Sequence, residues 1–277
     1  MTAGAVRVAR PATAFEFLER SAALRAADPV RTNVLGSVAT GVAQGRRYER
    51  EHWFLLEQAG GVVGAALWTV PYRLLVGPMP LDAAAELGAH VRAMDEQPAG
   101  VIGPAEVATA VADGGGWTAT PVMLERILVL GEYTPPPPVP GSARAAVEDD
   151  ADLATDWLVR FCEDAGTSMP DPRENFLSRL YAYRFWEVDG EPVSMAAHAP
   201  LVDTPAGAVA RIGPVFTPRE HRRRGFAGAI TASVVEHVLP QVSTVMLFTD
   251  AANPTSNGVY ERLGFRAVAE VVDLDLG

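Results

Sequence analysis

Residues 215–228, VFTPREHRRRGFAG, combine residue types that could bind a single anion. Arginines come first, a glycine follows them, and small residues stand close behind: Arg222, Arg223, Arg224, Gly225, Phe226, Ala227 and Gly228. If a helix begins at the glycine, its first backbone N–H groups have no acceptor within the helix, and the helix dipole adds partial positive charge. Glycine also lets the backbone curl and approach a ligand closely. The pattern therefore favours a phosphate or pyrophosphate site over a solvated run of charges.

A second segment, residues 250–265 (DAANPTSNGVYERLGF), predicts a short helix with strong end signals. Asn253 can cap its start, Pro254 suits its first turn, and Gly264 suits the position after its last turn. Tyr260 lies on this helix. Its hydroxyl could donate a proton in catalysis, or the side chain could simply pack and form a hydrogen bond.

Together the two segments resemble the GNAT superfamily of acyl-CoA N-acyltransferases. The family's phosphate loop follows the motif (Gln/Arg)-x-x-Gly-x-(Gly/Ala). In its later helix an asparagine comes first and a tyrosine one turn on faces the thioester sulfur. The residues that match are Arg222, Gly225, Ala227, Asn253, Asn257, Tyr260 and the closing tripeptide 263–265. The resemblance covers roughly residues 145–277.

The resemblance implies that acetyl-CoA binds here as the cosubstrate. The backbone of Val215, Phe216 and Thr217 would hydrogen-bond the pantetheine arm, and a gap between this strand and the one at 243–249 would admit it. A backbone N–H near Val215 and Phe216 would polarise the thioester carbonyl. The amides of residues 222–228 would hold the pyrophosphate, and the arginine side chains could reach the ribose phosphate.

Attack of an amine on a thioester needs a donor for the oxyanion, a deprotonated amine and a proton for the leaving thiolate. Tyr260 is the expected acid, and the resemblance places Asn253 and Asn257 near the cofactor. The base stays open, because several groups could serve and a water relay could replace them all. The candidates are His198, Glu163, Asp164, Asp250 and the terminal carboxylate of Gly277.

The elements that must position these residues follow from the apolar pattern of the second half. A strand at 208–217, a helix at 225–239 and a buried strand at 242–249 predict a parallel pair of strands joined by a crossover. The other expected elements are helices at 149–165, 173–183 and 253–263, and strands at 184–188, 192–199 and 265–276.

A proline run and an internal repeat divide the chain. Residues 133–141, YTPPPPVPG, favour a stiff polyproline II spacer. The hairpin pattern at 54–70 returns at 184–200, and a strand ending in Gly-Pro follows each copy. We expect an α/β fold of two tandem GNAT-like domains, each a mostly antiparallel twisted sheet with a central parallel pair flanked by helices. The expected division is a degenerate domain at 1–133, a linker at 134–141 and a catalytic domain at 142–277.

Composition narrows the function. The net charge of −11 argues against nucleic-acid binding, and the single cysteine excludes an internal disulfide and fits the cytoplasm. The spacing of the histidines favours no metal site, and the longest apolar run is too short to cross a membrane. The expected partner is a small-molecule or peptide amine, and the sequence does not specify an oligomeric state. We predict an N-acetyltransferase; the alternative is a CoA-binding regulatory or structural module without turnover.

Overall fold

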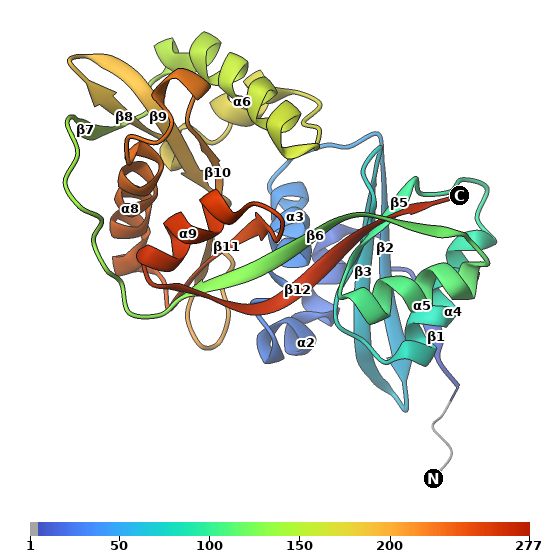
Figure 1. Cartoon of the computed structure of the whole chain (residues 1–277). Coiled ribbons are helices and arrows are strands. Elements are labelled where there is room, and N and C mark those ends of the chain that lie inside the picture. Colours follow the sequence, from blue (N-terminus) through green and yellow to red (C-terminus); the bar gives the residue numbers. More distant parts are fainter. Residues whose placement is uncertain (1–4) are drawn as a thin grey trace.

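One twisted sheet runs through the whole molecule (Figure 1). The computed structural model describes residues 5–277. Across these residues, twelve strands form the sheet in the order β1-β2-β3-β4-β5-β12-β6-β11-β10-β9-β8-β7. In chain order the strands are β1 (Arg7–Ala9), β2 (Arg50–Gln58), β3 (Gly61–Val70), β4 (Leu74–Val76), β5 (Gly100–Gly103), β6 (Ala119–Leu130), β7 (Ser142–Ala145), β8 (Arg184–Val188), β9 (Glu191–His198), β10 (Val209–Phe216), β11 (Thr244–Asp250) and β12 (Phe265–Leu276).

The strands are mostly antiparallel, with one parallel pair in each half of the chain. In the first half, β4 pairs with β5 in parallel. In the second half, β10 pairs with β11 in parallel, as the strand-helix-strand pattern predicted. The expected mixed α/β sheet, mostly antiparallel with one parallel pair in each half, is therefore confirmed.

Helices flank the sheet. They are α1 (Ala14–Arg20), α2 (Ala22–Ala27), α3 (Asn33–Ala43), α4 (Leu81–Arg92), α5 (Ala105–Gly115), α6 (Ala151–Ala165), α7 (Pro172–Leu177), α8 (Phe226–Val238) and α9 (Pro254–Arg262). The continuous helix expected at 173–183 was wrong, because α7 ends at Leu177 and a separate 3₁₀ turn covers Leu180–Ala182. Phe176 and Tyr183 are both buried and pack edge to face with ring centroids 5.0 Å apart. This packing turns the chain towards β8 and overrides the helical pattern.

The two halves exchange their long last strands. Strand β6 belongs to the first half of the chain, yet it lies between β11 and β12 of the second half. Strand β12 in turn lies between β5 and β6. Figure 1 shows this ribbon passing from the lobe that carries α8 and α9 to the lobe that carries α4 and α5. Each half therefore completes the sheet of the other, and the division into domains at 133 and 142 stays a prediction.

In the second half the sheet has two distinct faces. Ile212 of β10 packs with Ile230 of α8, so we call this side the α8 face; α9 packs on the same side. Phe216 of β10 packs on the opposite side against Trp157 of α6, with ring centroids 5.9 Å apart. We call that side the α6 face. The candidate active site lies where the sheet opens between these faces.

Candidate active site

The loop between β10 and α8 presents a row of free backbone donors. Residues 219–221 form a 3₁₀ turn, and α8 begins at Phe226 after Gly225, which has φ +87°. Arg223 is also left-handed, with φ +61°. Within residues 5–277, no acceptor takes the N–H groups of residues 223–228. Consecutive free amides at a helix start, curled by left-handed residues, are suited to binding an anion.

The three arginines of the loop differ in their contacts. Arg222 donates from Nε to the carbonyl oxygen of Thr217 at 2.9 Å, and its guanidinium also contacts the carboxylate of Asp164. Arg224 stacks over Phe226, with its guanidinium carbon 4.8 Å from the ring centroid. Arg223 has no side-chain partner among the described residues. Arg222 therefore braces the loop, and Arg223 is the arginine available to a ligand.

Strands β10 and β11 separate beside this loop. Their parallel pairing ends at Ile212 opposite Leu247, although β10 continues to Phe216 and β11 to Asp250. The register of β10 against β9 shifts between Ile212 and Val215, and Gly213 in this bulge has φ +148°, a conformation suited to glycine. The bulge keeps β10 on β9 and frees its other edge, which opens the expected gap towards β11.

The end of β10 is held from the β9 side. Ser194 of β9 donates from its hydroxyl to the carbonyl oxygen of Phe216 at 3.0 Å and lies 2.8 Å from the hydroxyl of Thr217. Because backbone groups alternate along a strand, the amide and carbonyl of Val215 point to the opposite edge, into the gap. The carbonyl of Thr217 already accepts from Arg222, so of the three expected strand contacts Val215 is the one the geometry favours.

Helix α9 follows the gap on its other side. Its N-cap Asn253 accepts a hydrogen bond from the backbone N–H of Ser256 at 3.1 Å. Asn257 is buried, and its Nδ2 donates to the carbonyl oxygens of Asp250 (3.2 Å) and Ala251 (3.4 Å). Its Oδ1 has no donor within the described chain. A buried acceptor without a donor beside the gap fits an amide-bearing ligand such as pantetheine.

Tyr260, one turn later, packs edge to face on Phe265 with ring centroids 6.2 Å apart. It is only 9% exposed, and its hydroxyl makes no hydrogen bond to any of residues 5–277. Burial raises the pKa of Tyr260 to about 12, so the hydroxyl keeps its proton at neutral pH. The hydroxyl is therefore free to donate a hydrogen bond to a ligand.

The structure gives most of the candidate bases from the sequence other hydrogen-bond partners or positions away from the gap. His198 lies within 2.8 Å of the carbonyl oxygen of Ala199 through Nδ1, and burial lowers its pKa. The hydrogen bonds from Arg219 and Arg222 hold the pKa of Asp164 below its usual range. The carboxylate of Gly277 lies in the lobe of α4 and α5, away from α9 (Figure 1).

The proline-rich segment runs beside the phosphate loop, which the sequence did not predict. A Cβ atom placed on Gly225 would lie 2.8 Å from Cγ1 of Val139, and one on Gly228 would lie 3.8 Å from Pro136. Tyr133 at the start of the segment donates to Glu236 of α8 at 2.7 Å. The segment therefore lines α8 as well as joining the halves. No local sequence signal reports such a contact.

Comparisons with known proteins agree with this geometry. Residues 191–272 match the family described as FR47-like protein. A GNAT-family acetyltransferase from Colwellia psychrerythraea is 11% identical, with a TM-score of 0.61 over 98% of this chain and 100% of that chain. A tandem GNAT protein from the clavulanic acid biosynthesis pathway is 16% identical, with a TM-score of 0.64 over 98% of both chains. A GCN5-related N-acetyltransferase from Sphaerobacter thermophilus is 18% identical, with a TM-score of 0.60 over 97% of this chain and 94% of that chain. No curated protein matches the chain.

The chain has the tandem GNAT fold. The FR47-like match runs from the start of β9 into β12, so it includes the gap, the loop and α9. In the first GNAT-like copy the corresponding strands, β4 and β5, do not separate. A Cβ atom on Gly103 of β5 would lie 2.5 Å from the carbonyl oxygen of Val76 of β4, so nothing separates these strands where β10 and β11 part. This closure supports a single cofactor site in the second half.

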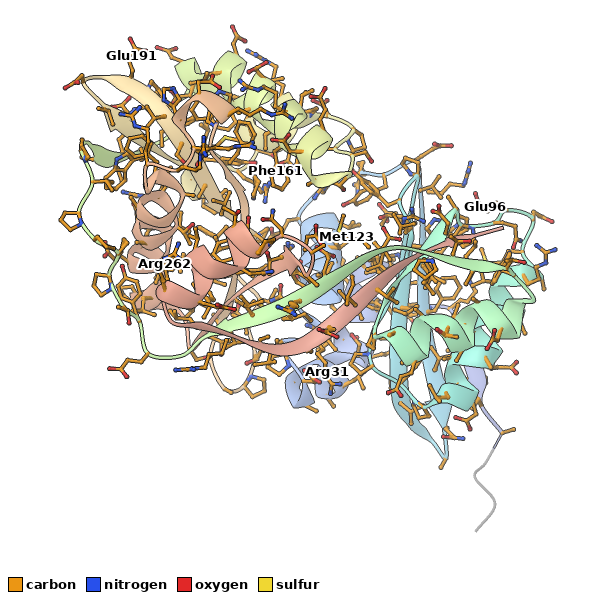
Figure 2. The ribbon with its side chains drawn as sticks, viewed as in Figure 1. Arg31, Glu96, Met123, Phe161, Glu191 and Arg262 are labelled. Carbon is orange, nitrogen blue, oxygen red and sulfur yellow. The ribbon has the colours of Figure 1, made fainter. Side chains whose placement is uncertain are left out.

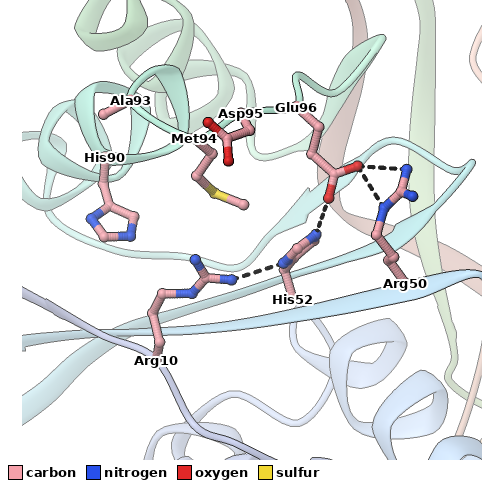
Figure 3. Close-up of a pocket in the computed structure, with 8 residues that line it drawn as sticks. All are labelled: Arg10, Arg50, His52, His90, Ala93, Met94, Asp95 and Glu96. Atoms are coloured by element: carbon pink, nitrogen blue, oxygen red, sulfur yellow. Dashed lines mark hydrogen bonds and ion pairs between the residues drawn. The ribbon is translucent and has the colours of Figure 1, made fainter.

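A pocket in the first half of the chain lies away from this site (Figure 3). Several of its charged and polar side chains pair with one another. His52 lies 2.7 Å from Glu96 and 2.8 Å from Arg10, and Arg50 contacts the same glutamate at 2.7 Å. It includes no residue of β10, α8 or α9.

Two further observations concern the described residues. None of their helices has the length and apolar character needed to cross a membrane. They contain no cluster of three or more histidine, cysteine or acidic side chains suited to holding a metal ion.

Proposed function

We propose that this protein is an N-acetyltransferase, which transfers an acetyl group from acetyl-CoA to a primary amine by direct attack in a ternary complex. The observation that carries this proposal is that three features lie in sequence around the point where β10 and β11 separate. They are the free loop amides, the strand gap and a tyrosine with a free hydroxyl. Each feature suits one part of the same elongated cosubstrate.

Different groups of the chain bind different parts of acetyl-CoA. The amides of residues 223–228 bind the pyrophosphate, and Arg223 adds a positive charge. The backbone of Val215 forms hydrogen bonds along the pantetheine arm, and Oδ1 of Asn257 accepts one from an amide of that arm. Acetyl-CoA supplies the activated thioester.

Tyr260 holds the proton that the leaving thiolate needs. Its raised pKa keeps the hydroxyl protonated until a strong base forms beside it. A backbone N–H near Val215 and Phe216 stabilises the developing negative charge on the carbonyl oxygen. The acceptor is a primary amine of a small molecule or peptide. We also assign the protein to the cytoplasm, where the unpaired thiol of Cys162 stays reduced.

A panel of primary amines tests this function. Thiol release from acetyl-CoA is recorded with each amine, acetylated product is identified by mass, and CoA binding is measured separately by calorimetry. Amine-dependent release with matching product is the expected result. CoA binding without release for any amine would instead support the non-catalytic CoA-binding module.

A further inference from the structure

Strand exchange brings one glutamate of the first half to the edge of the gap. Glu125 of β6 stands directly opposite Asp250 of β11 and opposite Val271 of β12. The pairing of β6 continues past this point, because Ala251 donates its N–H to the carbonyl oxygen of Leu124 at 2.9 Å. Glu125 is therefore anchored on both sides, next to the part of β11 that has separated from β10.

The side chain of Glu125 belongs to the α6 face. Ile127, two residues along β6, packs with Val209 and Met246 on that face, and alternation places Glu125 on the same side. Met123, two residues the other way, approaches the end of α6, where a Cβ atom on Gly166 would lie 4.0 Å from its Cε (Figure 2).

The proposed acid lies across the sheet from this glutamate. Tyr260 packs in the core of the α8 face, and the gap between β10 and β11 separates the two sides. A thioester in the gap would have a proton donor on one face and a carboxylate on the other. The amine would approach from the side of the carboxylate.

Among the acidic side chains near the gap, Glu125 stands out because its carboxylate has no hydrogen-bond or ion-pair partner among the described residues. Asp250 is committed, because its Oδ1 accepts from the N–H of Ala252 at 2.8 Å. Asp273 of β12 is committed as well, in an ion pair with Arg73 at 2.8 Å.

The charged groups that act on Glu125 lie on the adjacent strands β11 and β12 and on β10, the strand beyond β11. Burial first, then the negative charges of Asp273 and Asp250, raise the pKa of Glu125, and the charge of Arg211 on β10 lowers it. Arg211 does not pair with the glutamate but donates to Asn33 (3.1 Å) of α3. A carboxylate whose pKa moves towards neutrality becomes a better proton acceptor at working pH.

We propose that Glu125 is the general base of the acetyl transfer, supplied by the first half of the chain to the site in the second half. The proposal rests on the function proposed above. Glu125 takes one proton from the ammonium group, and the freed amine attacks the carbonyl carbon to form the N–C bond. The C–S bond breaks as the thiolate takes the proton of Tyr260. The remaining extra proton on the new amide nitrogen then returns to the Tyr260 phenolate, and Glu125 releases its proton to solvent. The acceptor is accordingly an amine that arrives protonated and enters from the α6 face.

Glu125→Gln tests the assignment, because it keeps the shape of the side chain and removes the base. We expect kcat/KM for the amine to fall about 10²–10⁴-fold, with CoA affinity unchanged by calorimetry. In the wild type the rate should fall at low pH as Glu125 becomes protonated. In the variant this limb should be replaced by a rise that follows the deprotonation of the free amine itself. Glu125→Asp, which keeps a carboxylate, should retain that low-pH limb even if the glutamine variant folds poorly.

Glu270→Gln is the matched control. It removes a carboxylate from the neighbouring strand on the opposite face, where Glu270 lies 3.6 Å from Arg126, and it should leave the rate and the pH profile unchanged. An active wild type whose Glu125→Gln variant keeps its rate and low-pH limb would overturn the assignment but leave the acetyltransferase standing. A wild type inactive with every amine would overturn both.

Discussion

The side chain of Tyr260 is only 9% exposed, yet its hydroxyl makes no hydrogen bond in the described chain and is free to donate a proton. The sequence predicted the helix that carries Tyr260, because Asn253 and Gly264 mark its ends; the acid role came from the family resemblance and stays a prediction. The environment of the hydroxyl could not be predicted, since it depends on Phe265 and on burial by distant strands. Glu125 was missed for the same reason: its surroundings come from strands far away in the sequence.

Replacing Tyr260 by Phe should slow amine acetylation about 10²–10⁴-fold without weakening CoA binding. The free energy of unfolding should change by only about 0.5 kcal/mol, because the lost hydroxyl makes no hydrogen bond in the described protein. Steady-state kinetics, calorimetry with CoA and denaturant unfolding check the three quantities. A normal rate in a well-folded Tyr260→Phe variant would make the tyrosine a packing residue.

At the scale of elements, the positions of the strands and helices around the site were predictable because their apolar patterns and end signals are local. The helix expected at 225–239 is α8 at Phe226–Val238, and the strand expected at 208–217 is β10 at Val209–Phe216. Where β10 leaves β11 was not predictable from these patterns alone. The separation depends on the bulge at Gly213, which is visible only once β9 is in register.

Gly225→Ala should damage the phosphate loop in two ways. Alanine in a left-handed conformation costs roughly 1–2 kcal/mol, and its methyl group would press on Val139, so the loop amides should shift and CoA should bind more weakly. Gly190→Ala is the control, because Gly190 has φ +83° in the hairpin between β8 and β9 and no atom lies within 4 Å of an added Cβ. Unfolding measurements should show similar losses of stability, whereas calorimetry should show weaker CoA binding for Gly225→Ala alone. Equal CoA affinities in the two variants would separate the loop from CoA binding.

At the scale of the whole molecule, the exchange of β6 and β12 makes the two GNAT-like copies interdependent. The sequence predicted a strand in each of these places. Apolar periodicity identifies a strand but does not show which strands pair with it. Each of these strands has 12 residues, so length does not assign either one to its own copy. The exchange also places Glu125 of the first copy beside the gap in the second copy, as its proposed role as base requires.

Cutting the proline-rich segment should leave the protein in one piece. If residues 135–138 are replaced by a protease site, the cleaved halves should still elute together as a particle of about the intact 29.4 kDa mass, because β6 stays paired with β11 and β12. Separating them should require denaturant, and CoA binding should survive the cut as long as the pieces stay joined. The uncleaved variant serves as the control for the effect of the replacement itself on Val139 and the phosphate loop. Halves that part on a sizing column without denaturant would contradict the exchanged arrangement, since two self-contained copies joined by a spacer would separate once the spacer is cut.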